Sequence, residues 1–406
     1  MKIKELIAEI NDNKVKFNLN FYLVGGAVRD LVLGLNPTDL DFVYTGKSNE
    51  IENFINKTFN PQSLEISQFN TYKLEYKNFS IDFAMCRQEV YTSPGSLPVI
   101  KEGDLKQDQQ RRDFTMNTLY IDTKDFSLDN IIDPYNGFND IKSKLIKTLH
   151  VKSFSDDPTR IFRAIRYAKR LDFKIDNKTN NQIEEFRFNI NKLSGTRIRN
   201  EIYKILNENK VIETIKTCEN LGVFKSMNLE LSFPPSNIDW EDYKSFDKLI
   251  SNEKSMQNKF LLMLVTFFSD TKDDEIELIS KRFHFERTIK NKWIDIVNIK
   301  KQLNKLDFDS SSDSKLYNIL QKSNIQICIG LTQWFSSKEN MRIYKYWNTT
   351  RKIEPNLKSK DLLELGINEG PKIGELLKEL KKQVINNVLQ TKEQEIEFVK
   401  NVTNLD

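Results

Sequence analysis

Strand-like sequence is confined to about the first 150 residues of this 406-residue chain, and this limit constrains the fold more than any other feature. Within that part, short runs rich in aromatic and β-branched residues alternate with turn residues, as is typical of strands. The predicted strands are residues 21–24, 40–44, 72–76, 79–85 and 118–122. A helix is expected from Ala27 to Leu33, stopped by Gly34 and Pro37. The sequence therefore predicts an α+β unit, a small mixed sheet with helices on it.

From about residue 151 onward, apolar residues recur at the three- and four-residue spacing of amphipathic helices. The predicted helices are 158–171, 180–186, 195–206 and 211–221. Gly222 and the pair Pro234-Pro235 suggest a boundary, and residues 355–360 resemble a linker before two or more Lys- and Glu-rich helices. An all-helical remainder is therefore expected to follow the head. The predicted parts are a head (1–150), a neck (151–222), a body (223–355) and a tail (356–406).

The composition is that of a soluble globular protein, with 38% hydrophobic and 30% charged residues. The densest apolar run, Phe260 to Phe268, is too short to cross a bilayer and predicts a buried helix instead. The N-terminal segment from Met1 to Glu5 is charged and lacks the apolar stretch of a secretion signal. A membrane role is therefore not expected. The net charge of +4 is weak evidence for a polyanionic partner, so local clusters of charge matter more.

Cysteine and histidine usage excludes several kinds of site. Cys86, Cys218 and Cys328 are far apart in sequence, which disfavours both a disulfide framework and a structural zinc site and fits a reducing cytoplasm. The two histidines, His150 and His284, are not followed by Asp, so a His-Asp metal phosphohydrolase is not expected.

Gly25-Gly26 lies between a predicted strand and a predicted helix, and Arg29 follows on the first helical turn. Two glycines allow a ligand to approach the backbone closely, and the N–H groups of a helix N-terminus favour phosphate. Taken alone, however, a Gly-Gly pair more often marks only a tight turn.

Asp39 and Asp41 are two residues apart on a predicted strand, so their side chains point to the same face. Two such carboxylates repel each other unless a cation lies between them, and Mg²⁺ prefers oxygen ligands. An Asp-x-Asp pair alone is often a solvated turn. Asp82 is a candidate third carboxylate, because its apolar flanks predict a half-buried strand.

Two further clusters combine charge with hydrogen-bonding groups. The first contains Arg111, Arg112, Asp113 and Asn117. Its arginine pair suits contacts with phosphate or ribose. A cluster of structural salt bridges is an equal alternative. The second contains Asp157, Arg160, Arg163 and Arg166 at the start of a predicted helix. Asp157 and Arg160 are neighbours on one helix face, where an Asp can accept from the exocyclic amine of C or A and an Arg can donate to the ring. An Asp before Pro is also a standard helix cap, and the residues alone favour that simpler explanation.

In combination, Gly-Gly-x-x-Arg-Asp, Leu-Gly and Asp-x-Asp resemble the head motif of the class II tRNA nucleotidyltransferase and bacterial poly(A) polymerase family, within the polymerase-β-like superfamily. The resemblance extends from about residue 20 to 206 and is weaker to about residue 400. It implies that Asp39 and Asp41 hold catalytic Mg²⁺, that Asp82 supports them, and that Gly25, Gly26 and Arg29 contact the triphosphate. It also implies sugar and phosphate contacts for Arg111, Arg112, Asp113 and Asn117. Asp157 and Arg160 would then read the base, with Arg163 and Arg166 facing the nucleotide.

The resemblance also covers segments with supporting roles. The segment from Arg87 to Gln110 lies where the family has a flexible loop that helps switch between C and A, and it is polar and expected to be mobile. Arg197 and Glu201 match family residues that brace the neck, and Gly366 to Gly374 is similar to a tail segment that docks on the tRNA body. Asp156 stands where Glu is usual in the base-reading motif, which leaves Asp157 and Arg160 intact.

The function implied is template-independent addition of CCA, with C and A taken from CTP and ATP, to the 3′ end of tRNA in the cytoplasm. The resemblance implies two-metal nucleotidyl transfer that releases pyrophosphate, with Mg²⁺ as cofactor. Enzymes that add only CC, only A or a poly(A) tail share these motifs, so those alternatives stay open. An inactive RNA-binding relative is the alternative from another functional class, and the intact acidic pair argues against it. The sequence does not indicate an oligomeric state.

Overall fold

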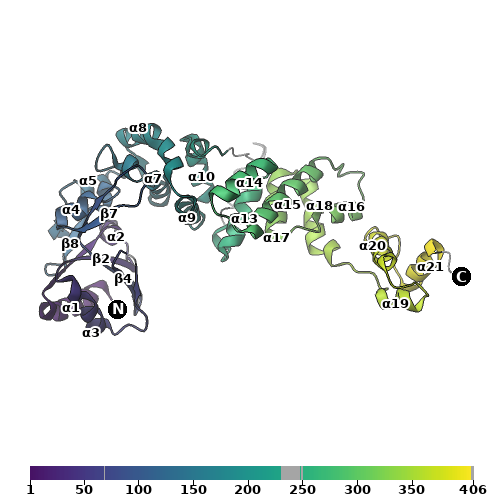
Figure 1. Cartoon of the computed structure of the whole chain (residues 1–406), viewed down its shortest axis with the longest axis horizontal. Helices are drawn as coiled ribbons and strands as arrows, with labels where there is room; N and C mark the ends of the chain where they lie inside the picture. Colours follow the sequence, from purple (N-terminus) through teal and green to yellow (C-terminus); the bar gives the residue numbers. More distant parts are fainter. Residues whose placement is uncertain (68, 230–246, 248–249, 404–406) are drawn as a thin grey trace. The chain divides into compact units, whose positions relative to one another are not determined.

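The computed structural model describes residues 1–67, 69–229, 247 and 250–403, so the predicted boundary at Pro234-Pro235 lies outside the described residues. The chain forms two compact units, residues 1–229 and 230–406 (Figure 1). The finer division into head, neck, body and tail stays a prediction. Strands are found only in the first unit among the described residues, which confirms a sheet-containing head followed by a mostly helical remainder.

The first unit is built on a seven-stranded sheet with the order β3-β4-β5-β2-β1-β8-β9. Its strands are β1 (Leu19–Val24), β2 (Asp39–Gly46), β3 (Glu65–Ile66), β4 (Thr71–Tyr76), β5 (Phe79–Met85), β8 (Tyr120–Asp122) and β9 (Ile131–Ile132). Only β2 and β5 pair in parallel, and the other neighbours are antiparallel. β4 and β5, which match the predicted strands 72–76 and 79–85, pair as an antiparallel hairpin. The last predicted strand is shorter than expected, because residues 115–117 form a 3-10 helix before β8.

One face of this sheet is buried beneath aromatic side chains. Phe21 on β1 and Phe83 on β5 meet Phe54 of α3 (Ile51–Phe59), with ring centroids of Phe21 and Phe54 4.6 Å apart. Helix α1 (Ile3–Lys14) lies beside α3 (Figure 1). Because side chains alternate along a strand, the residues between these aromatics project to the opposite face. Asp39 and Asp41 belong to that opposite face.

The segment predicted as a polar, mobile loop contains regular structure. Residues Arg87–Val90 form β6, Val99–Glu102 form β7, and the two pair as an antiparallel hairpin. Helix α4 (Leu105–Gln110) follows, with Asp104 accepting from the backbone N–H of Gln107 at its N-terminus. The prediction of a loop was wrong here because the hairpin has few apolar residues on either face, so periodicity gave no signal.

The helical part of the first unit follows the predictions closely. Its helices are α5 (Gly137–Lys142), α6 (Ser153–Asp156), α7 (Thr159–Leu171), α8 (Asn177–Phe186), α9 (Gly195–Leu206), α10 (Val211–Asn220) and α11 (Val223–Ser226). The predicted neck contains one strand, β11 (Lys174–Ile175), which pairs with β10 (Leu145–Ile146) across the predicted boundary at residue 150. Two residues are too few to give a detectable strand pattern.

The second unit is helical wherever it is described. Its longer helices are α13 (Met256–Phe267), α14 (Asp273–Arg282), α15 (Arg287–Asn304), α16 (Asp313–Leu320), α17 (Ile325–Leu331), α18 (Ser337–Asn348), α19 (Ser359–Glu364), α20 (Pro371–Ile385) and α21 (Lys392–Thr403). Helix α13 is buried along most of its length, as its apolar run predicted. Across the described parts of the chain, no helix combines the length and the hydropathy that crossing a membrane requires. Cys86, Cys218 and Cys328 are all free and buried.

The C-terminal helices enclose a small apolar core that is closed by one buried carboxylate. Leu362, Leu380 and Val399 belong to that core. Glu395 on α21 is fully buried and accepts hydrogen bonds from the backbone N–H groups of Asn356 (3.0 Å) and Leu357 (2.8 Å). This carboxylate therefore ties the segment before α19 to the last helix.

Replacing Glu395 with Ala is expected to destabilise the C-terminal helices by about 3 kcal/mol, because two buried backbone donors would lose their acceptor. Hydrogen exchange of residues 356–403 measures this loss directly. The exposed Glu397, two residues along the same helix, supplies the control. Equal protection in Glu395→Ala and Glu397→Ala would contradict the prediction.

Candidate active site

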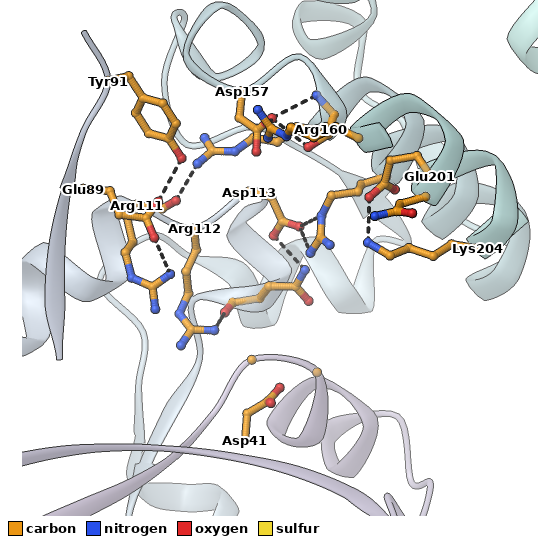
Figure 2. A pocket seen from close by; sticks show the side chains of 17 residues that line it. Asp41, Glu89, Tyr91, Arg111, Arg112, Asp113, Asp157, Arg160, Glu201 and Lys204 are labelled. Atoms are coloured by element: carbon orange, nitrogen blue, oxygen red, sulfur yellow. Dashed lines mark hydrogen bonds and ion pairs between the residues drawn. The ribbon is translucent and has the colours of Figure 1, made fainter. Parts of the chain in front are cut away.

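A pocket of about 440 Å³ lies within the first unit, between the sheet, the β6–β7 hairpin and the helices α7 and α9 (Figure 2). Side chains of both charges line it, so it suits a polar ligand that carries charge. The lining residues are Gly25, Gly26, Asp41, Glu89, Tyr91, Arg111, Arg112, Asp113, Asn117, Asp157, Thr159, Arg160, Arg163, Arg197, Asn200, Glu201 and Lys204.

The floor of the pocket is the turn that joins β1 to α2 (Gly26–Val32). Gly25 has φ +67°, a conformation that L-residues with a side chain rarely adopt. A Cβ atom at Gly25 would lie 2.7 Å from Nη1 of Arg112, whereas one at Gly26 would lie 3.5 Å from Nη2 of Arg29. Gly25 is therefore required by the fold, while a Cβ at Gly26 would make only an ordinary contact.

Replacing Gly25 with Ala is expected to cost about 1–3 kcal/mol, since it forces a strained φ and displaces Arg112. Gly26→Ala makes only an ordinary contact, so its thermal stability should equal that of the unaltered chain. Thermal unfolding of the two variants measures the difference. A Gly25→Ala variant as stable as Gly26→Ala would show that the turn tolerates a side chain.

The strand register gathers three carboxylates on the open face of the sheet. Asp39 and Asp41 lie on β2, and Asp41 is aligned with Asp82 on the parallel strand β5. Burial by the surrounding protein raises the pKa of Asp41, although its carboxylate is open to the pocket; Arg112 opposes the shift and Asp39 adds to it. Burial also raises the pKa of Asp82, with Lys73 opposing. The raised pKa values of Asp41 and Asp82 indicate that the protein's own positive groups do not fully compensate the negative charge of these carboxylates.

These carboxylates have the donor chemistry of a Mg²⁺ site. Mg²⁺ is often held by one or two carboxylates together with phosphate oxygens of a substrate. Within the described residues, no three His, Cys, Asp or Glu side chains are close enough to hold a metal as a protein-only set. The acidic pair Asp39 and Asp41, with the open face above it, fits a cation that shares its coordination with a bound phosphate.

Arg111 and Arg112 are held on the pocket wall by one buried carboxylate. Asp108 on α4 is fully buried and accepts from Nε of Arg111 (2.9 Å), Nη2 of Arg112 (3.2 Å) and the hydroxyl of Tyr120. Burial alone would raise the pKa of Asp108, but the two guanidiniums lower it overall. Arg111 also contacts Glu89 on the hairpin (3.2 Å). The two arginines are therefore fixed in position before any ligand arrives.

Asp113 is a second buried anchor in the pocket. Its Oδ2 accepts from Nε (2.8 Å) and Nη2 (2.6 Å) of Arg163, and its Oδ1 accepts from Nδ2 of Asn117 (2.9 Å; Figure 2). Burial opposes ionisation, yet Arg163 and the hydrogen bonds lower the pKa of Asp113 to about 2. The carboxylate is therefore charged at neutral pH and orients Arg163 from the head side.

Asp157 and Arg160 lie at the start of α7, both in the pocket wall. Oδ1 of Asp157 accepts from the backbone N–H of Thr159 (3.0 Å) and from Nη2 of Arg197 (2.7 Å). Arg160 donates to Oγ of Ser153 (2.8 Å) and to the carbonyl of Arg111 (2.6 Å). The predicted helix cap is not formed, because α7 begins at Thr159 with Pro158 as its flanking residue. Oδ1 of Asp157 instead bridges Thr159 and Arg197, and Oδ2 has no hydrogen-bond partner among the described residues.

The comparisons with known proteins agree with one another over almost the whole chain. Residues 21–147 match the family described as the poly A polymerase head domain, and residues 172–233 match the probable RNA and SrmB-binding site of polymerase A. The A-adding tRNA nucleotidyltransferase of Aquifex aeolicus is 27% identical over 389 residues, covering 91% of this chain and 45% of that protein. The CCA-adding enzyme of Staphylococcus epidermidis is 26% identical and covers 93% of both. A solved complex of CCA-adding enzyme with ATP is 26% identical with a TM-score of 0.81, covering 100% of this chain and 96% of that one.

The head of this chain, residues 21–147, belongs to the poly A polymerase head family, and the chain is similar to tRNA nucleotidyltransferases over almost its whole length. It spans about half the length of the Aquifex relative and nearly the full length of the Staphylococcus one. The family membership predicted from the paired glycines and aspartates is therefore confirmed, as is the head-plus-helices fold.

Most of the residues that the family resemblance pointed to meet in the one pocket, and four do not line it. Asp39 and Asp82 share the face of Asp41 without reaching the pocket lining. Arg29 is buried beneath the Gly25-Gly26 turn, where Nη1 donates to Oδ1 of Asn117 (2.8 Å) and Nε donates to Asp30 (2.8 Å). Arg166 is buried against Glu208 (2.9 Å). In this family member the two arginines therefore support the pocket from behind.

Sequence reasoning missed five lining residues, one of which is Thr159, and for the other four two kinds of signal were available. Asn200 and Lys204 lie on the same face of α9 as Arg197 and Glu201, at the spacing i, i+3, i+4, i+7. Glu89 and Tyr91 alternate along the hairpin, where Tyr91 donates to Oε2 of Glu89 (2.8 Å). A helical-face pattern could have found the first pair, whereas the second required recognition of the hairpin.

Proposed function

We propose that this chain is an enzyme that adds C and A, taken from CTP and ATP, to the 3′ end of tRNA without a nucleic-acid template. The single observation that carries the proposal is that one pocket joins the carboxylate strand, through Asp41, to the paired Asp157 and Arg160. The first supplies a site for chemistry on phosphates and the second a site for recognising a base. A relative that adds CCA supports the fuller activity.

In the proposed reaction, the 3′ oxygen of the RNA forms a bond to the α-phosphorus of the nucleotide. The bond from that phosphorus to the bridging oxygen of the β-phosphate breaks, and pyrophosphate leaves. Mg²⁺ held by Asp39 and Asp41 would supply Lewis-acid stabilisation of the phosphate charge. Arg111 and Arg112 would bind the triphosphate, since both guanidiniums are already oriented by Asp108 and need no reorganisation.

Base selection would rest on Asp157 and Arg160. The second oxygen of Asp157 can accept from the exocyclic amine that C and A share. The same carboxylate would face a carbonyl oxygen in U or G, which is repulsive. Arg163 and Asn117 would hold the sugar and phosphate side of the nucleotide. The hairpin residues Glu89 and Tyr91 close the pocket opposite Asp157.

An A-adding enzyme is the second candidate, because the Aquifex relative carries that activity in its name. Both candidates share the pocket, so its geometry does not separate them. A cytoplasmic location belongs to the same proposal, since tRNA is the substrate and the three cysteines are free.

The test is extension of purified tRNA transcripts that end before CCA, after two C residues, or with a complete CCA end. CTP and ATP are supplied with Mg²⁺, separately and together. We expect the shortest transcript to gain three nucleotides and then stop. Extension of only the CC-ending transcript, by one A, would establish the A-adding activity instead. If none of the transcripts is extended, the proposed function is wrong.

A further inference from the structure

Tyr167 on α7 lies at the centre of an unusual cluster of cations. The ring is only 8% exposed, and four guanidinium carbons lie within 6 Å of its centroid. The distances from that centroid are 5.5 Å for Arg29, 5.4 Å for Arg163, 4.9 Å for Arg166 and 4.8 Å for Arg170. Arg29 comes from α2 and the other three come from α7, so the ring is contacted from both sides of the junction between sheet and helices.

Four like charges around one ring repel each other, so the cluster needs compensation. Carboxylates supply part of it, since Asp30 pairs with Arg29, Asp113 with Arg163, and Glu208 with Arg166. The aromatic ring supplies the rest, because the negative face of its π system attracts guanidinium groups. Tyr167 contacts all four guanidiniums.

The same contacts form a closed chain of hydrogen bonds and cation–π contacts, the circuit, which includes residues of the pocket wall. The hydroxyl of Tyr167 accepts from Nη2 of Arg163 (3.2 Å), and Arg163 donates to Asp113. Asp113 accepts from Asn117 (2.9 Å), and the side-chain oxygen of Asn117 accepts from Arg29 (2.8 Å). Arg29 then returns to the ring of Tyr167. Three members of this circuit, Arg163, Asp113 and Asn117, line the pocket.

The circuit determines what Arg163 can offer a ligand. Its Nε and Nη2 groups are used by Asp113 and Tyr167, and among the described residues its Nη1 group has no hydrogen-bond partner. A guanidinium fixed along two of its edges presents the third in a defined direction, which favours a bidentate or directed contact with an anionic group.

We propose that Tyr167 is a positioning residue that orients Arg163 and Arg29, and through them Asp113 and Asn117, for binding the nucleotide. This inference rests on the proposed function for the identity of the ligand. Tyr167 does not line the pocket and acts only through the arginines. Its edge-to-face contact with Phe114, with centroids 6.0 Å apart, holds the ring itself in place.

The test compares Tyr167→Phe with Tyr167→Leu, using CTP and ATP as the probes. Phe keeps the ring and loses the hydroxyl, whereas Leu loses both. We expect Tyr167→Leu to raise KM for the nucleotide by about tenfold or more with little change in kcat, because ground-state positioning is lost along with the four cation–π contacts. The KM of Tyr167→Phe for the nucleotide should stay within about threefold of the KM of the unaltered chain.

Phe162 supplies a matched control, since it is fully buried on the same helix and is replaced by Leu with a similar loss of aromatic volume. Phe162→Leu should lower the thermal stability and leave KM unchanged. An equal rise of KM in Phe162→Leu, or a Tyr167→Leu variant that binds both nucleotides normally, would overturn the positioning role. An equal loss in Tyr167→Phe and Tyr167→Leu would overturn the role of the ring, because the hydroxyl contact with Arg163 would then account for the whole effect.

Failure of the proposed function gives a different result. In that case the unaltered chain extends none of the tRNA transcripts. Direct calorimetric binding of CTP and ATP to the unaltered chain and to the three variants still tests the positioning role, because the readout does not require turnover.

Discussion

Replacing Asp41 with Asn is expected to lower the rate of tRNA extension by about 10³-fold or more. Asp41 is the carboxylate that lies both on the acidic face of β2 and in the pocket wall. Asn has the same shape but lacks the charge that would hold Mg²⁺ against a triphosphate. Metal-derived stabilisation of phosphate charge amounts to several kcal/mol, and about 4 kcal/mol corresponds to a thousandfold change in rate. Single-turnover extension with saturating CTP or ATP measures the loss.

Thermal stability separates loss of chemistry from loss of fold in this variant. The pKa of Asp41 is raised in the folded chain, mainly by burial and also by Asp39, so its ionised form is disfavoured by folding. A neutral Asn removes that penalty, and the variant should unfold at the same temperature as the unaltered chain or a higher one. Glu75→Gln, an exposed change on β4, which is separated from β2 by β5, controls for the general loss of negative charge. If Asp41→Asn extends tRNA at the normal rate, the metal-site proposal is wrong.

Local patterns predicted the elements of the head and neck well, because each depends on residues close in sequence. Alternating apolar residues marked β1, β2, β4 and β5, and the apolar period of three and four marked α7, α9 and α10. The Gly25-Gly26 turn was also visible, since only glycine adopts its backbone conformation easily. These features are determined by steric and hydrophobic preferences within a few residues.

The residues that hold the site in place were not predictable in the same way, because their contacts depend on which elements become neighbours. Asp82 is aligned with Asp41 only because β2 and β5 pair in parallel. Asp108 lies in the polar stretch Gln107 to Gln110, which was predicted as part of a mobile loop. It is fully buried because Tyr120 of β8 meets it there together with Arg111 and Arg112, which follow it at i+3 and i+4. Burial of a charge is decided by its tertiary partners and leaves no periodic trace.

Asp108→Asn is expected to have the largest effect on stability in the first unit. The carboxylate of Asp108 compensates both Arg111 and Arg112 and also accepts from the backbone N–H of Arg87 (3.3 Å). Removing one partner from a buried ionic cluster typically costs about 3–5 kcal/mol, and here Arg112 loses its carboxylate partner while Arg111 keeps only Glu89. In a unit of this size the unfolding midpoint should fall by roughly 10 °C. Nucleotide affinity should fall as well, because both arginines lose their orientation.

The matched control and the pH dependence make this prediction specific. Asp104→Asn, four residues earlier at the cap of the same helix, should be nearly neutral, because Asn caps helices about as well as Asp.

The two guanidiniums hold the pKa of Asp108 below its usual value, so its stabilisation is present above about pH 4 and is lost as the pH falls through the folded-state pKa. The stability difference between the unaltered chain and Asp108→Asn should therefore be largest at neutral pH and shrink below pH 4. Denaturant unfolding at a series of pH values measures it, and a difference that does not depend on pH would mean that shape, rather than charge, makes Asp108 important.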